Sequence, residues 1–134
     1  MSETYDITKI MEVAGGYSPE CYAFIRDGLA HTVGMVHGED AVSLPIAVED
    51  ESRHVSGHQL CLGLRDFGVQ QYGLLARDVL NRWGIHETLD FGKIVFAMVE
   101  AGLMRKTDDD TLDDFRNVYQ FDEAFDAPAP TMLN

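Results

Sequence analysis

The sequence has few of the residues that mark specialised protein classes. Only two of its 134 residues are cysteines, Cys21 and Cys61, so it lacks the disulfide framework of a small secreted domain. No apolar run approaches the roughly 18 residues of a membrane helix. Residues 1–10 lack the basic-then-apolar pattern of a signal peptide. We therefore expect a cytoplasmic protein that does not associate with membranes, with both thiols reduced and buried.

Basic residues are also scarce. Ten Lys and Arg residues stand against 23 Asp and Glu residues, which gives a net charge of -13 and an isoelectric point of about 4.5. General binding to nucleic acid or to anionic lipid needs clustered cations. The charge balance therefore predicts no nucleic-acid partner.

The motifs of several enzyme classes are absent as well. The sequence contains no G-x-G-x-x-G loop, no Walker lysine and no G-x-S-x-G nucleophile elbow. We therefore predict no catalytic residue and no cofactor.

The composition that remains is that of a globular protein. Hydrophobic residues make up 46% and charged residues 25%, and the length suits one domain. We expect a single globular domain over 1–125, followed by a flexible tail at 126–134. Within that domain we expect N-terminal helices at 3–33, a mobile connection at 34–55 and a C-terminal unit at 57–121. The connection is predicted because helical periodicity is lost there.

Two helices are predicted in the N-terminal part. Apolar residues recur with helical spacing over 3–14. Ser18 and Pro19 are typical of a helix start, because serine caps free amides and proline suits the first helical position. We extend this second helix to Val33. Gly28 lies in its apolar stripe and predicts the close approach of a neighbouring helix.

Three further helices are predicted in the C-terminal half. Ser56 can cap a helix over 57–71, whose apolar residues lie on two faces and place it centrally between other elements. Helices over 74–83 and 89–101 follow. The turn between them contains Gly84, which suits a left-handed helix cap.

A β-hairpin is predicted after these helices. Residues 103–107 and 115–121 have the composition of strands, and an acidic turn at 108–110 separates them. Helix, turn, helix and hairpin is the order of elements in a winged helix. We therefore expect a mainly α fold of the α+β type, with four to five helices, a C-terminal β-hairpin and a winged-helix-like C-terminal half.

The tip of this predicted wing is acidic. Five carboxylates are found there, namely Asp108, Asp109, Asp110, Asp113 and Asp114. Carboxylates placed against DNA phosphates repel them. We therefore do not expect the wing to bind DNA.

A second line of evidence is a resemblance to a known family. Its residues in the C-terminal half are Gln71–Ala76, Val79–Ile85, Thr88, Asp90–Phe96, Glu100–Leu103, Asp114, Phe115 and Val118–Phe121, and it extends to Tyr22–Ile25 and His54–Gly57. This pattern resembles a family of conserved hypothetical proteins largely restricted to Planctomycetes and Verrucomicrobia. The resemblance implies a bacterial cytoplasmic protein and assigns no catalytic residue.

Two histidines have a spacing found in metal sites. His54 and His58 are four residues apart, so on a helix both imidazoles could reach one metal ion. No glutamate follows His54 as in the His-Glu-x-x-His zinc motif, and His54 precedes the predicted cap of the helix. The two histidines are therefore weak metal candidates, and we favour a surface position for His58 near a helix start.

The outward face of the predicted helix 89–101 is a candidate partner surface. With Phe91 turned inward, the outward positions are Lys93, Phe96, Ala97 and Glu100. Phe96 gains little there unless the hairpin, the N-terminal helices or another molecule covers it.

These features favour a non-enzymatic, acidic protein-interaction module that binds a protein partner or self-associates. One alternative is a small metal- or ligand-binding enzyme that uses the histidines. Another is a regulator that contacts DNA through a surface other than the wing.

Overall fold

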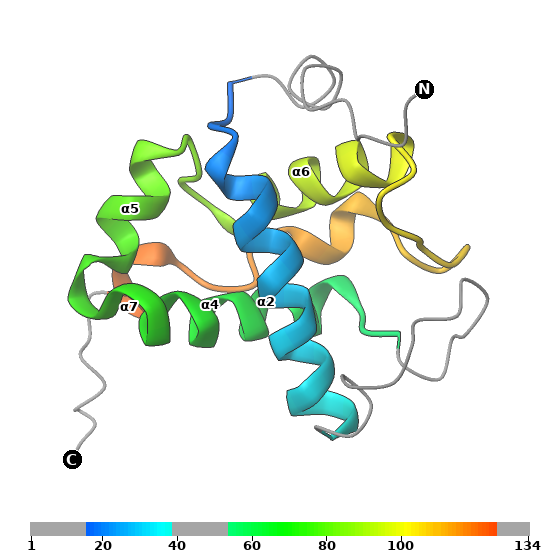
Figure 1. Ribbon diagram of the computed structural model, residues 1–134, viewed down its shortest axis with the longest axis horizontal. Coiled ribbons are helices and arrows are strands. Elements are labelled where there is room, and N and C mark those ends of the chain that lie inside the picture. The colour runs from blue at the N-terminus through cyan, green and yellow to red at the C-terminus, as the bar shows by residue number, and fades with distance from the viewer. Residues whose placement is uncertain (1–15, 39–53, 126–134) are drawn as a thin grey trace.

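The computed structural model describes residues 16–38 and 54–125 (Figure 1). The predicted helix at 3–14, most of the predicted connection and the predicted tail lie outside these residues. The described elements, in chain order, are α2 (Glu20–His37), α4 (Gly57–Tyr72), the 3-10 turn η2 (Gly73–Leu75), α5 (Ala76–Arg82), α6 (Thr88–Glu100), the 3-10 turn η3 (Leu112–Phe115) and α7 (Phe121–Ala124).

The predicted β-hairpin is wrong, and with it the winged-helix-like half and the α+β assignment. The described residues contain no strand. Residues 115–118 bond to a helix where the prediction had a partner strand. The Thr88 hydroxyl on α6 donates to Phe115 O at 2.6 Å and accepts from Val118 N at 3.1 Å. These two bonds occupy the backbone groups that a hairpin ladder would need.

Helix α4 lies at the centre of the fold, as its two apolar faces predicted. It packs against α2 on one side and against η3 on the other (Figure 1), and Arg65 Nε donates to Ala124 O of α7 at 3.1 Å. A side chain at Gly28 of α2 would overlap Leu64 of α4, and one at Gly63 would overlap Thr32. The predicted close approach at Gly28 is therefore confirmed.

The side chain of Phe115 packs between α4 and α6. The ring of Phe115, which is 3% exposed, lies beside Gly57 of α4 and Gly92 of α6. A Cβ at either glycine would come within 2.7 Å of that ring. The aromatic residues that suggested a strand lie in η3, in α7 and in the segment between them, and Phe115 and Phe121 are buried in the core.

Several helix boundaries follow local signals, but α2 continues to His37, past its predicted end at Val33 and into the predicted connection at 34–55. Ser56 caps α4 as predicted, and its hydroxyl accepts from Gln59 N at 3.1 Å. Gly84 ends the α5 turn at φ +94°, as a left-handed cap requires. Ser18 departs from its prediction, because its hydroxyl donates to the Glu20 carboxylate and does not cap α2.

Candidate functional site

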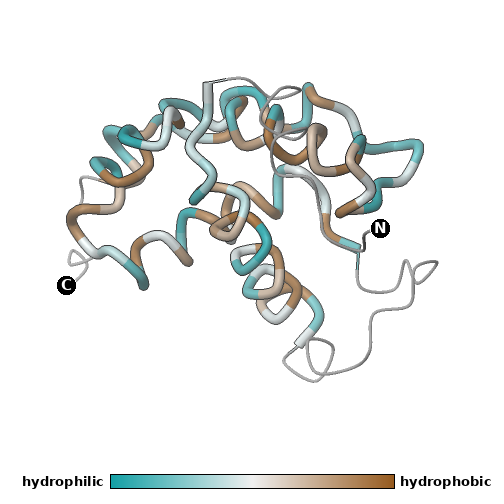
Figure 2. Tube along the Cα trace, turned by 45° about the horizontal axis from the view of Figure 1, so that its top comes forward, coloured by the Kyte–Doolittle hydropathy of each residue, from teal (hydrophilic) through white to brown (hydrophobic). Residues whose placement is uncertain are grey.

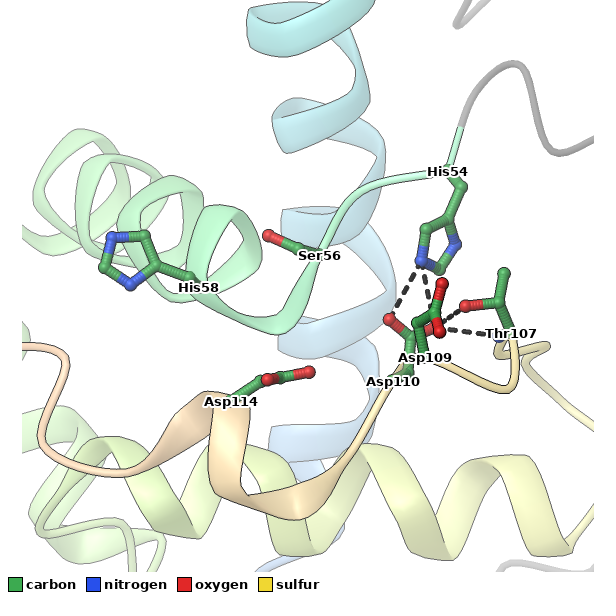
Figure 3. Close-up of a pocket in the computed structure, with 7 residues that line it drawn as sticks. All are labelled: His54, Ser56, His58, Thr107, Asp109, Asp110 and Asp114. Atoms are coloured by element: carbon green, nitrogen blue, oxygen red, sulfur yellow. Dashed lines mark hydrogen bonds and ion pairs between the residues drawn. The ribbon is translucent and has the colours of Figure 1, made fainter.

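A polar pocket of about 610 Å³ lies between the start of α4 and the loop before η3 (Figure 3). The side chains that line it are His54, Ser56, His58, Thr107, Asp109, Asp110 and Asp114. The fold therefore brings both candidate histidines to one pocket, together with part of the predicted acidic tip.

His54 links three parts of the chain. Its Nε2 lies 2.9 Å and 3.1 Å from the two carboxylate oxygens of Asp110. Its backbone oxygen accepts from Nε2 of His37, at the end of α2, at 2.7 Å. Asp110 also accepts from the Thr107 amide at 2.8 Å. His54 therefore connects the end of α2, the residues just before α4 and the acidic loop through polar contacts.

The two histidines do not converge. The ring of His54 points to Asp110, whereas the exposed ring of His58 points away from it on α4 (Figure 3). Helix α4 begins only at Gly57, so His54 is not in helical register with His58. Among the residues that the structure describes, no group of three or more His, Cys, Asp or Glu side chains could hold a metal ion.

The hydroxyl groups of the pocket are held in structural bonds. Ser56 caps α4, and Thr107 Oγ1 lies 3.3 Å from Asp110. An Asp–His pair acts in nucleophilic catalysis when it activates a hydroxyl or thiol within reach. The bonds seen at Ser56 and Thr107 stabilise local turns instead. The pocket is therefore best described as a set of polar contacts between the start of α4 and the acidic loop.

The two cysteines are buried thiols, as the sequence predicted. Cys21 and Cys61 are both 0% exposed. Burial raises the pKa of each thiol from 9.0 to about 12. A reactive cysteine needs thiolate at neutral pH, so neither is a candidate nucleophile.

The candidate partner surface on α6 is largely covered. Ala97 is 1% exposed, and half-buried Phe96 packs edge-on against Phe115 at 6.3 Å between ring centroids. Lys106 lies over the Phe96 ring at 5.9 Å. The chain after α6 therefore supplies the cover, and Lys93 and Glu100 stay exposed.

A different exposed apolar site lies where α4 turns into α5. Leu74 and Leu75 are 68% and 62% exposed, the highest values among the large hydrophobic residues of the described part. We call the turn Gly73–Leu75 the leucine corner. In Figure 2 hydrophobic residues mark its outer edge, at the left of the molecule.

The leucine corner is fixed by backbone hydrogen bonds. Gly73 has φ +56°, and its amide donates to Val69 O as the cap of α4. The amide of Ala76 donates to Gly73 O, and the Ala76 side chain is fully buried. Sequence reasoning missed this site because it began the helix over 74–83 at Leu74 and so placed both leucines in its first turn. The structure has a 3-10 turn there, and α5 begins only at Ala76.

The chain matches no protein-family model, no curated protein and no solved structure. None of its described helices is long and apolar enough to cross a membrane.

Proposed function

We propose that this protein is a non-enzymatic, acidic protein-interaction module that binds through the leucine corner. The observation that carries the proposal is the exposure of two adjacent leucines, 68% and 62%, on a turn with a hydrogen-bonded backbone. Exposed apolar side chains that gather at one place mark interaction sites more often than isolated ones do.

The surroundings of the corner support this proposal. Residues 67–76 contain no charged residue, although charged residues make up 25% of the chain. Gln70 and Gln71 are exposed beside the leucines. Interface cores are depleted of charge and surrounded by polar groups, and the corner has this composition.

The proposal is tested with the double variant Leu74→Ser and Leu75→Ser. Because both side chains are exposed, we expect the free energy of unfolding to change by less than about 1 kcal/mol. Retention of protein partners from the native cell extract should fall at least tenfold. Leu62→Ser, which alters an exposed leucine on α4, is the matched control and should retain them. Equal retention by all three proteins would contradict the proposal.

A second candidate function is binding of a small polar molecule in the His54 pocket. The observation that favours it is the volume of about 610 Å³, which lies within the usual range of ligand sites. Titration of the purified protein with small polar molecules, followed by the imidazole NMR signals, tests it. A saturable shift of these signals that is lost in Asp110→Ala would favour this candidate.

A further inference from the structure

We draw no further inference here: the strongest candidate, the exposed apolar patch that Leu74 and Leu75 form at the turn between α4 and α5, carries nothing beyond the proposed function, because nothing in the structure shows what covers it.

Discussion

Gly84 is the residue on which the turn between α5 and α6 depends most. Its φ of +94° is strained for any residue with a side chain, and an added Cβ would lie 2.6 Å from the backbone oxygen of Gly16. Backbone atoms cannot move aside as a flexible side chain can. Gly84→Ala should therefore lower the free energy of unfolding by about 2–4 kcal/mol, from strain and overlap together.

Gly102→Ala is the matched control for this prediction. Gly102 has a similar φ of +83° but open space around its Cβ position. It should therefore lose only the conformational part, about 1 kcal/mol. Urea unfolding curves measure both losses, and equal losses would show that the contact with Gly16 contributes nothing.

The two thiols should not react with disulfide reagents in the folded protein. Burial raises the pKa of Cys21 and of Cys61 to about 12, and only the thiolate reacts with disulfide reagents. We expect no reaction with Ellman's reagent at pH 8 until urea unfolds the chain, and then two thiols per molecule. Rapid reaction of one thiol without urea would contradict the burial.

At the scale of single elements, the sequence predicted two structures whose cause is local, although the Ser18 cap did not form. The α4 cap at Ser56 and the left-handed turn at Gly84 depend on neighbouring residues, and both are confirmed. Helix α6 begins at Thr88, one residue before its predicted start, and Glu87 and Asp90 form its capping box. Such signals were readable because they act within one helical turn.

Structures whose cause lies far along the chain were not predictable. The segment 115–121 alternates like a strand, yet its backbone bonds to Thr88, 27 and 30 residues away. Its Tyr119 hydroxyl donates to Cys61 O at 2.7 Å, 58 residues away. The pocket at His54 depends in the same way on Asp110. The spacing of His54 and His58 suggested that both could reach one metal ion. It could not show that Asp110, 56 residues from His54, would orient the His54 ring.

Thr88 provides a direct test of why no hairpin forms. Its side chain is 1% exposed and makes two bonds to the segment after η3. Thr88→Val keeps the shape of the side chain but leaves the buried Phe115 carbonyl and the part-buried Val118 amide without this partner. We expect a loss of about 2–4 kcal/mol in the free energy of unfolding.

Thr88→Ser is the control, because it keeps the hydroxyl and removes only a methyl group. It should lose about 1 kcal/mol. Chemical denaturation compares the two variants. A serine variant as unstable as the valine variant would assign the effect to packing and not to the hydrogen bonds.

At the scale of the whole molecule, burial favours the protonated form of three weakly acidic side chains in the core. Burial raises the pKa of Cys21 and Cys61 from 9.0 to about 12 and that of Tyr22 from 10.0 to about 12. The Tyr22 hydroxyl has no hydrogen-bond partner within the described structure, so its ionised form gains no compensating bond there. Folding therefore favours the protonated state of all three groups.

The sign of the pH dependence follows from these shifts. Below about pH 9 the three groups are protonated in both states, so their contribution to stability is fully present. As the pH rises toward 12, the unfolded chain loses protons that the folded chain keeps, and stability falls. Urea unfolding at a series of pH values from 7 to about 11 measures this loss, which should approach about 1.4 kcal/mol per pH unit for each such group. Cys61→Ala removes one of the three groups, so its stability should decline less steeply over the same interval. A stability that stays constant to pH 11 would show that these side chains titrate freely and that the core around α4 is open to water.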